Sequence, residues 1–326
     1  MNLAGTVHLN KTGIAIFAIG FLLIFYYAFL RDTSSMNNIR TINLKELLQT
    51  SILAANEGGL EVLKYKNTND IRSKGKTKEG ANDSVTMADL KSHCVMMGTI
   101  KSYDKRIRVI SEEAVDKCDY TGSDRIIKLS EIDELVDVNV PVDDVTVWID
   151  PLDATQEFTE GLLHYVTTMV CVAVKNRAVI GVIYQPLIKK WYWGWVGVGL
   201  SDKNIQVKAK SDDFIKIIVS RSHKGAVEEM IKSSQLKNFK ITTAGGAGYK
   251  VLEVVKGEND VYIHTTNIKK WDICAGNAIL DALGGKMVDL KGNLIDYGYD
   301  SNHIHENGLI ASTKSDDIYL NKFVNN

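Results

Sequence analysis

The stretch VTVWIDPLDAT, residues 145–155, decides the fold assignment because it carries a strand directly into an acidic turn. Valine, threonine and tryptophan in its first half are typical of a strand. Asp150 and Asp153 bracket Pro151 where that strand ends, and the fixed φ of proline makes the turn between them stiff. We therefore expect both carboxylates on one side of the turn, with the Leu152 carbonyl aimed at the same point and Thr155 close behind.

Strands and short turns surround this run on both sides. Strand patterns occur at Arg106–Ile110, Val166–Val174, Val179–Tyr184 and Trp191–Val198. Turns at Lys175-Asn176 and Pro186 are tight, which predicts an antiparallel meander for the last three strands. After about residue 205 strands alternate with helices: strands at Phe214–Val219 and Val261–His264, helices at Ala226–Lys232, Tyr249–Val255 and Ile273–Leu283. The pattern indicates a mixed α/β chain whose halves, 41–205 and 206–326, pack intimately because no long linker separates them.

Two helices are predicted ahead of these strands. Asn43 can cap the first, with Glu46 three residues on and an apolar face that begins at Leu44. Residues 67–84 are polar and contain glycine, which predicts a mobile loop. A second helix is predicted to begin near Met87.

The overall composition is that of a globular protein. Of 326 residues, 45% are hydrophobic and 24% are charged. Three prolines and the lack of a repeat exclude a disordered or solenoid chain. A formal net charge of −1 gives no overall attraction to nucleic acid, so we expect no nucleic-acid partner. An anionic ligand must then be bound by local positive groups.

The N-terminal region departs from this composition. Residues 13–30 carry no charge, and as a helix they would span about 27 Å, close to the roughly 30 Å hydrocarbon core of a membrane. A cleaved signal peptide is the alternative, although its apolar core is usually about 7–15 residues long. The aromatic residues before Arg31 also make a poor cleavage site. We predict a transmembrane anchor at 13–30, between a tail, 1–12, and a polar stem, 31–40. The positive-inside rule leaves its orientation open.

The cysteines are Cys94, Cys118, Cys171 and Cys274, and they lack the CxxC spacing of a zinc site. Cys171 lies in an apolar strand pattern and Cys274 in a helical one, so buried free thiols are the simplest interpretation of both. The even count also permits disulfides in an oxidising compartment, with a pairing that the sequence does not define.

Carboxylates recur where strands end and where predicted helices begin. Six share this placement: Asp89, Glu112, Glu113, Asp150, Asp153 and Asp272. Oxygen ligands of this kind suit hard cations such as Mg²⁺. Each also has an ordinary alternative: a capping turn for Asp-Pro-x-Asp, solvated surface for the Glu-Glu pair, and the helix dipole for Asp272. Taken together, they predict a magnesium site.

Three motifs resemble, in their order and rough spacing, the inositol monophosphatase superfamily of lithium-sensitive, magnesium-dependent phosphatases. They are the Glu-Glu pair at 112–113, WIDPLDAT at 148–155 and WDICAG at 271–276. The resemblance runs from about residue 41 to the end of the chain. It implies an α/β (α+β) fold, the layered αβαβα sandwich of that superfamily, here preceded by one transmembrane helix.

Longer strings resemble one branch of the superfamily, the Golgi-type branch that hydrolyses the 3′-phosphate of adenosine 3′,5′-bisphosphate. These strings are VTMAD at 85–89, SRSH at 220–223, GGAGYK at 245–250 and IKKWDICAGNAIL at 268–280. Ala154 and Ser111 depart from the common superfamily pattern, which has glycine at both positions. We interpret both residues as marks of the branch.

The resemblance implies a role for each matching residue. The implied metal ligands are Glu112, Asp150, the Leu152 backbone oxygen, Asp153 and Asp272. Asp89 and Thr155 would position or deprotonate the attacking water, so that hydrolysis needs no covalent nucleophile. The implied substrate contacts are Ser220, His223, Gly246 and Lys250. The glycines would let the backbone approach the nucleotide, the turn before helix 249–255 would present N–H groups to an anion, and Lys250 would add positive charge for the phosphate that is not cleaved.

The same resemblance implies two or three Mg²⁺ ions, a small-molecule nucleotide substrate and assembly as a homodimer. It also implies a single-pass type II protein of the Golgi membrane with a lumenal catalytic domain. We expect an enzyme, a 3′(2′),5′-bisphosphate nucleotidase. The alternatives are an inositol phosphate phosphatase and a non-catalytic, membrane-anchored scaffold. The complete acidic set argues against the scaffold, because relic sites tend to lose charged clusters that destabilise the fold.

Overall fold

The computed structural model describes residues 19–20, 40–67, 71–76, 82–114, 118, 130–202, 205, 214–221, 227–233, 238–313 and 323. Residues 42–326 form one compact unit, and residues 1–41 are assigned to another. Within the residues listed above, no helix combines the length and apolarity needed to cross a membrane. The predicted anchor at 13–30 lies outside the described residues, apart from Ile19 and Gly20.

Six strands form the first sheet, in the order β10-β9-β8-β7-β6-β4. Its members are β4 (Arg108–Ser111), β6 (Val145–Asp153), β7 (Thr167–Val174), β8 (Arg177–Gln185), β9 (Lys190–Trp195) and β10 (Gly199–Leu200). Antiparallel pairing from β6 through β9 confirms the predicted meander, whereas β4 runs parallel to β6. Both faces of the sheet are buried, which explains why its strands are apolar throughout instead of alternating with polar residues.

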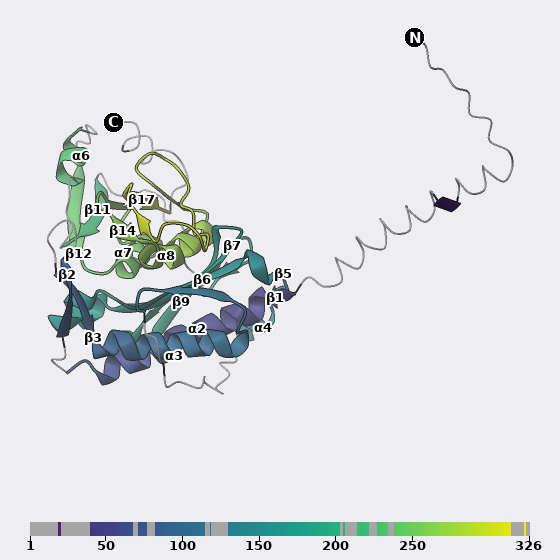
Figure 1. Ribbon diagram of the computed structural model, residues 1–326. Helices are drawn as coiled ribbons and strands as arrows, with labels where there is room; N and C mark the ends of the chain where they lie inside the picture. Colours follow the sequence, from purple (N-terminus) through teal and green to yellow (C-terminus); the bar gives the residue numbers. More distant parts are fainter. Residues whose placement is uncertain are drawn as a thin grey trace, which may run out of the picture. The chain divides into compact units, whose positions relative to one another are not determined.

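Two long helices cover one face of this sheet, α2 (Leu44–Lys64) and α3 (Met87–Tyr103) (Figure 1). Asn43 caps α2 as predicted, since its side-chain oxygen accepts hydrogen bonds from Lys45 N at 2.9 Å and Glu46 N at 3.1 Å. Alternate residues of β6 meet these helices in a core that includes Leu48, Met96, Val145, Val147 and Ile149. The intervening residue Trp148 points to the opposite face of the sheet.

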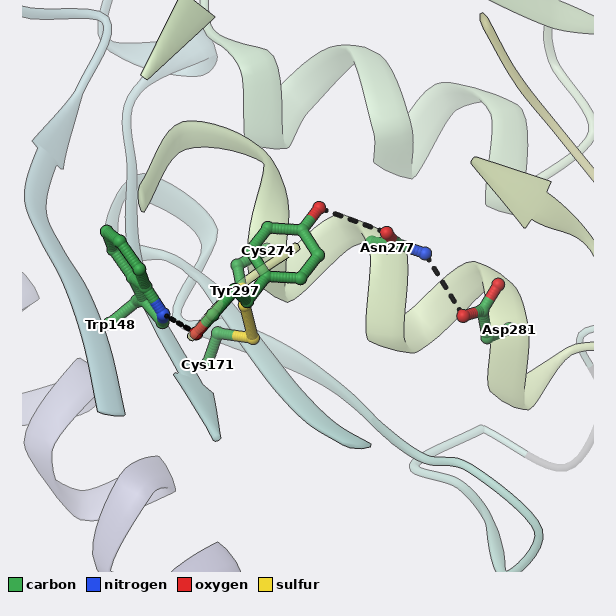
Figure 2. The surroundings of a disulfide bond; sticks show 6 residues. All are labelled: Trp148, Cys171, Cys274, Asn277, Asp281 and Tyr297. Carbon is green, nitrogen blue, oxygen red and sulfur yellow. Dashed lines mark hydrogen bonds between the residues drawn. A yellow bond between two sulfur atoms is a disulfide. The ribbon is translucent and has the colours of Figure 1, made fainter. Parts of the chain in front are cut away.

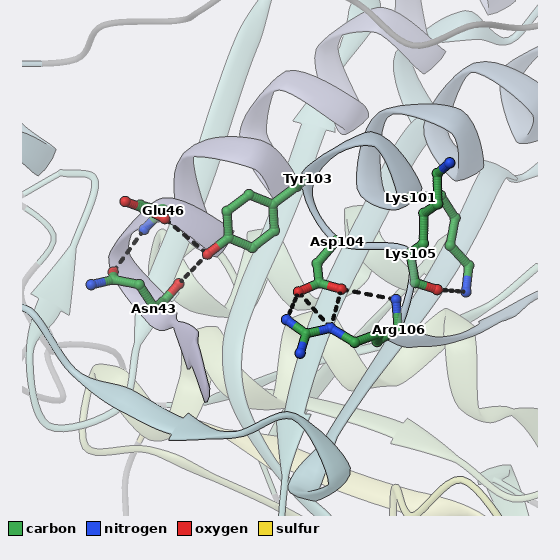
Figure 3. Close-up of polar contacts among 7 residues, drawn as sticks. All are labelled: Asn43, Glu46, Lys101, Tyr103, Asp104, Lys105 and Arg106. Carbon is green, nitrogen blue, oxygen red and sulfur yellow. Dashed lines mark hydrogen bonds and ion pairs between the residues drawn. The ribbon is translucent and has the colours of Figure 1, made fainter. Parts of the chain in front are cut away.

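Polar contacts join the start of α2 to the end of α3 (Figure 3). The Tyr103 hydroxyl lies 3.0 Å from Glu46 Oε2 and 3.2 Å from Asn43 O. Just beyond α3, Arg106 pairs with Asp104. The Tyr103 contacts hold two helices together, whereas the Asp104–Arg106 pair joins near neighbours at the surface and adds little to stability.

A β-hairpin occupies much of the segment that the sequence predicts to be a mobile loop, 67–84. It consists of β2 (Ile71–Lys76) and β3 (Asn82–Thr86), which pair antiparallel. The loop prediction is therefore wrong for these residues. Strand pairing is made by backbone groups, so a polar hairpin leaves no hydrophobic signal in the sequence. β3 leads directly into α3.

Five strands form the second sheet, in the order β12-β11-β13-β17-β15. They are β11 (Ile215–Ser220), β12 (Phe239–Ala244), β13 (Val261–His264), β15 (Lys286–Val288) and β17 (Leu309–Ser312). β11 and β13 confirm the predicted strands. β11 runs parallel to both β12 and β13, and β17 lies antiparallel between β13 and β15.

Helices cover both faces of the second sheet. On one face α6 (Val227–Ser233) packs through Val227 and Ile231 against Ile217 and Val219. On the other face lie α7 (Ala247–Val255) and α8 (Lys270–Ala282), which share a core with Ile218. The remaining elements are β1 (Thr41–Asn43), α4 (Ser130–Asp133), β5 (Asn139–Pro141), η1 (Val142–Asp144), α5 (Thr155–Thr159), η2 (Leu163–Tyr165), η3 (Pro186–Ile188), β14 (Ile268–Lys269) and β16 (Ile304–His305).

Helix α8 lies against the first sheet at two glycines. A Cβ at Gly181 of β8 would fall 2.0 Å from the Ala275 carbonyl oxygen, and one at Gly194 of β9 would fall 2.8 Å from Ile279 Cα. Only glycine permits this close approach of helix to strand. The layers therefore run α2 and α3, first sheet, α7 and α8, second sheet, α6, which is the predicted αβαβα sandwich (Figure 1).

Candidate active site

The acidic turn lies buried at the end of β6. Asp150 is 1% exposed and Asp153 is 7% exposed. A bulge separates them, because β6 pairs with β7 at Asp150–Met169 and again at Asp153–Thr167 with a shift of register between. Asp150 Oδ1 also accepts a hydrogen bond from the Leu152 N–H at 3.1 Å, which closes the turn locally. The strand end thus holds both carboxylates on a rigid element.

Ala154 completes this turn in a left-handed conformation, with φ 71° and ψ 45°. A side chain with a Cβ adopts this conformation at a cost of about 1 kcal/mol, which glycine avoids. The glycine of the common superfamily pattern at this position therefore has a conformational reason. In this chain alanine keeps the conformation and bears the strain.

Electrostatic interactions show which carboxylates share the space around Asp150. Burial raises the pKa of Asp150 well above its ordinary value, and the negative charges of Glu112, Asp153 and Asp272 raise it further. Burial likewise raises the pKa of Asp272 to about 8, with a further contribution from Asp153. Glu112 is held beside β6 by its backbone N–H, which donates to Ile149 O at 3.2 Å. The structure therefore brings together carboxylates from the ends of β4 and β6 and from the first turn of α8.

The donor set fits a hard divalent cation. Within the described ranges, no group of three or more His, Cys, Asp or Glu side chains is already arranged so that it could hold a metal ion. The fit rests on chemistry instead: buried carboxylates that repel one another are stabilised by a cation with oxygen ligands. The ligands that the resemblance implies are thus neighbours, and their shared charge is what a cation would neutralise.

The start of α7 binds Asp153. Asp153 Oδ1 accepts a hydrogen bond from Ala247 N at 3.0 Å. Asp153 Oδ2 accepts hydrogen bonds from Gly248 N at 2.8 Å and from Thr167 Oγ1 at 3.0 Å. The expectation that these N–H groups face a substrate anion is wrong for both, because an anionic side chain of the protein already occupies them. The helix N-terminus favours that negative charge. These hydrogen bonds connect the end of β6 to the second half of the chain.

Gly246 and Lys250 lie next to Asp153. Gly246 has a positive φ of 64°, and a Cβ there would fall 2.9 Å from Asp153 Oδ2 and 2.8 Å from Tyr165 O. The Lys250 side chain is buried, and its Nζ donates to Gly246 O at 2.5 Å and lies 5.2 Å from the centre of the Tyr262 ring. Burial lowers the pKa of Lys250, while the negative charge of Asp153 opposes that shift. Lys250 is therefore a buried basic group beside the acidic cluster, by which we mean Glu112, Asp150, Asp153 and Asp272.

Asp89 and Thr155 meet in the structure, although 66 residues separate them. Asp89 is fully buried, and its Oδ2 accepts from Thr86 N at 2.7 Å and from Thr86 Oγ1 at 2.6 Å. Its Oδ1 lies 3.0 Å from Thr155 Oγ1, which is also 3.1 Å from Leu152 O. Burial raises the pKa of Asp89 to about 6, against the hydrogen bonds from Thr86. A carboxylate with this pKa is suited to proton transfer near neutral pH.

Ser220 lies at the same edge of the second sheet as Gly246. It ends β11 directly opposite Ala244 of the parallel strand β12, two residues before Gly246. The carboxyl ends of parallel strands commonly bind ligands in α/β proteins. His223 lies in 222–226, outside the described residues.

Two buried glutamates near the site are absent from the ligand set that the family resemblance implies. Glu113 is 6% exposed, and its negative charge raises the pKa of Asp89. Glu157 of α5 is 4% exposed and accepts from the Arg221 guanidinium at 3.1 Å. The Glu-Glu pair contained the signal for Glu113. The Glu157–Arg221 contact joins residues 64 apart and had no sequence signal.

All four cysteines form disulfides, Cys94–Cys118 and Cys171–Cys274. The interpretation of Cys171 and Cys274 as free thiols is therefore wrong. Cys171 lies on β7 and Cys274 on α8, and their Cα atoms are 5.7 Å apart although 103 residues separate them. Only the packing of α8 on the first sheet makes this pairing evident.

A phosphatase is the class of protein that this fold and this site define. The chain belongs to the Inositol monophosphatase family, whose profile matches residues 43–325. The family assignment agrees with the resemblance carried by the Glu-Glu, WIDPLDAT and WDICAG motifs.

Several relatives match nearly the whole chain. "Putative inositol monophosphatase 3" of Drosophila melanogaster is 44% identical over 292 residues, covering 87% of this chain and 82% of the relative. "Inositol monophosphatase 3" of Danio rerio is 44% identical and covers 95% of this chain and 94% of the relative. "Golgi-resident adenosine 3',5'-bisphosphate 3'-phosphatase" of Mus musculus is 41% identical and covers 94% of both chains.

Solved structures support the fold. The extragenic suppressor protein suhB from Bartonella henselae has a TM-score of 0.62 at 19% identity, covering 84% of this chain and 96% of that chain. CysQ from Bacteroides thetaiotaomicron has a TM-score of 0.59 at 22% identity, covering 83% of this chain and 98% of that chain. The predicted inositol monophosphatase-like sandwich is confirmed by these structures.

Proposed function

We propose that this phosphatase hydrolyses the 3′-phosphate of adenosine 3′,5′-bisphosphate to AMP and phosphate, with Mg²⁺ as its cofactor. The observation that supports the metal site is the grouping of Asp150, Asp153 and the partly buried Asp272, where burial and neighbouring charge raise the pKa values of Asp150 and Asp272, a cost that a divalent cation would offset. Glu112 and the Leu152 carbonyl complete the proposed ligand set for two or three ions. Bound there, Mg²⁺ would supply a Lewis acid that acidifies water and stabilises both oxygens of an in-line displacement.

The proposed proton acceptor is Asp89, with Thr155 as its positioning partner. Thr86 holds one carboxylate oxygen of Asp89 and Thr155 holds the other, so the carboxylate has a fixed orientation. Its raised pKa, about 6, lets it take a proton from water and release it again near neutral pH. Direct hydrolysis by water requires no covalent nucleophile.

The proposed nucleotide contacts are Ser220, His223, Gly246 and Lys250. Ser220 ends the parallel strand β11 and Gly246 follows β12, at strand ends where α/β proteins commonly bind ligands, and the Lys250 amine donates to Gly246 O. The names of the mouse, rat and cattle relatives, which are 41–44% identical, support the adenosine bisphosphate as substrate. An inositol phosphate is the second candidate, supported by the names of the fly and fish relatives at 44% identity.

The proposed location is the Golgi lumen, with residues 13–30 as a type II membrane anchor. The names of the mammalian relatives support the Golgi, and two disulfides suit an oxidising lumen better than the cytosol. Protease treatment of sealed vesicles tests this placement: residues 42–326 should be protected until detergent is added. Digestion in intact vesicles would contradict it. Assembly as a homodimer stays a prediction.

A phosphate-release panel tests the substrate. The full-length protein is assayed with adenosine 3′,5′-bisphosphate, adenosine 5′-monophosphate and inositol 1-phosphate, each with Mg²⁺, with EDTA, and with Mg²⁺ plus Li⁺. Release from the bisphosphate alone, lost in EDTA and inhibited by Li⁺, supports the proposal. Equal or faster release from the inositol phosphate would favour the second candidate.

A further inference from the structure

The disulfide Cys171–Cys274 joins α8, which carries Asp272, to β7, the strand paired with β6 (Figure 2). Cys171 of β7 stands directly opposite Trp148, two residues before Asp150 on β6. Cys274 lies in α8, two residues after Asp272. The covalent link therefore ties the first turn of α8 to the sheet within two residues of a proposed metal ligand on each side.

The arrangement of the carboxylates depends on this same connection. Asp150 and Asp153 belong to β6 and Asp272 belongs to α8, so the three side chains stay together only while the helix remains against the sheet. Both cysteines are fully buried, at 1% and 0% exposure, in the core between them. A covalent bond at this depth holds the start of α8 directly against the sheet. Apolar contacts farther along α8 hold that start only indirectly, through the rest of the helix.

We infer that Cys171–Cys274 is a positioning link for the metal site: it holds the Asp272 carboxylate beside Asp150 and Asp153 while no cation is bound. The inference rests on the metal site of the proposed function but not on the proposed substrate. The link lowers the free energy needed to assemble the ligands, so its loss weakens cation binding more than it weakens the fold.

The Cys94–Cys118 bond has a similar placement on the other side of the site. Cys94 follows Asp89 by five residues on α3, and Cys118 follows Glu113 by five residues. A hydrogen-bond contact of 2.8 Å between His93 Nδ1 and Ser111 Oγ joins the same two segments. The Cys94–Cys118 bond thus joins two segments that contribute carboxylates, whereas Cys171–Cys274 joins one such element, α8, to the strand beside another.

Calorimetric titration with Mg²⁺ in the absence of substrate tests the inference. The full-length double variant Cys171→Val/Cys274→Ala replaces the link with apolar side chains of similar total volume. Ile279→Ala is the matched control: Ile279 is buried on the same helix, about 10 Å from Asp272 along its axis, so the variant weakens α8 packing and leaves the link intact. The Kd for Mg²⁺ should rise by about 10- to 100-fold in the double variant and remain near the wild-type value in Ile279→Ala.

Equal Kd values for Mg²⁺ in the double variant and the wild type would overturn the inference, and so would an equal rise in Ile279→Ala at the same loss of thermal stability. If the double variant does not fold, the wild-type protein is titrated after reduction with TCEP, which supplies two electrons per disulfide and leaves two thiols. Alkylation and mass spectrometry then count the reduced cysteines, and an unchanged Kd in the reduced protein contradicts the link. A wild-type protein that binds no Mg²⁺ would instead refute the proposed metal site.

Discussion

Strand β6 and helix α8 meet in two polar regions of opposite character. At one end lie the buried Asp150 and Asp153 and the partly buried Asp272; burial raises the pKa of Asp150 and of Asp272, and the charge of Asp153 raises both further. At the other end a chain of hydrogen bonds is fully paired (Figure 2). Trp148 Nε1 donates to Tyr297 O at 3.0 Å, Tyr297 Oη donates to Asn277 Oδ1 at 3.0 Å, and Asn277 Nδ2 donates to Asp281 Oδ2 at 3.1 Å.

The paired hydrogen bonds stabilise the fold, whereas the grouped carboxylates suit the binding of a ligand. Satisfied buried hydrogen bonds hold β6, α8 and the segment at Tyr297 in one arrangement. Buried carboxylates without a neutralising partner destabilise the same junction, a cost that the proposed cation would offset. Removing a charge from the acidic region should therefore stabilise the metal-free protein, whereas removing a hydrogen-bond donor from the paired region should destabilise it.

Asp150→Asn should have the largest effect. It removes one charge from the acidic region and can keep the hydrogen bond from Leu152 N to Oδ1. Phosphate release should fall by at least about 10²-fold, while the metal-free protein should melt at a higher temperature because repulsion is relieved. Activity assays and thermal melts in EDTA check both parts. A variant that is inactive and also less stable would place Asp150 in the structural region, against the comparison.

Tyr297→Phe should show the reverse behaviour. It leaves Asn277 Oδ1 without its donor, which should lower the free energy of unfolding by about 1–3 kcal/mol. The Mg²⁺ concentration that gives half-maximal activity should not change, since no carboxylate of the acidic region is touched. Urea unfolding and a Mg²⁺ titration measure the two quantities. Tyr299→Phe, at a position that is 43% exposed, is the matched control and should change neither.

Asp281→Asn should have a smaller effect that depends on pH. Burial raises the pKa of Asp281 from 3.8 to about 6, against the positive charges of Arg177 and Lys286. The folded protein thus holds this proton more tightly than the unfolded chain, so Asp281 makes stability fall as the pH rises from about 4 to 6.

The Asp281→Asn variant should not lose stability in this way as the pH rises. It should be more stable than wild type by on the order of 1 kcal/mol at pH 7 and equal to it near pH 4. Urea unfolding at both pH values checks the result, with the exposed Asp300→Asn as control. A gain in stability that is the same at pH 4 and pH 7 would show that the charge is not its cause.

Arg106→Ala should have the smallest effect and sets the baseline for both regions. The Asp104–Arg106 pair lies at the surface, near the end of α3 (Figure 3). Exposed pairs between near neighbours contribute little because water solvates the separated charges well. The unfolding midpoint and the activity should match the wild type. A clear shift in either would mean that surface charge, and not only the two buried regions, controls the protein.

Most elements of the fold could be predicted because their signals are local. The Asn43 cap, the apolar strands of the meander and Asp89 in the first turn of α3 all follow from short patterns. Strand β12 gave no such signal, since its residues Phe239–Ala244 are largely exposed and polar. The hairpin of β2 and β3 was missed because strand pairing is made by backbone groups, which leave no signal in a polar side-chain pattern.

The sequence by itself determined the chemistry of the site, because carboxylates at strand ends and helix starts are visible in short motifs. The tertiary structure decided which residues are hydrogen-bond and disulfide partners. It assigned the α7 N–H groups to Asp153, 94 and 95 residues away, and joined Cys171 to Cys274 across 103 residues. It also buried Lys250 and Glu157 beside the cluster. These contacts depend on how two sheets and the helices between them pack, and no local pattern of residues specifies that packing.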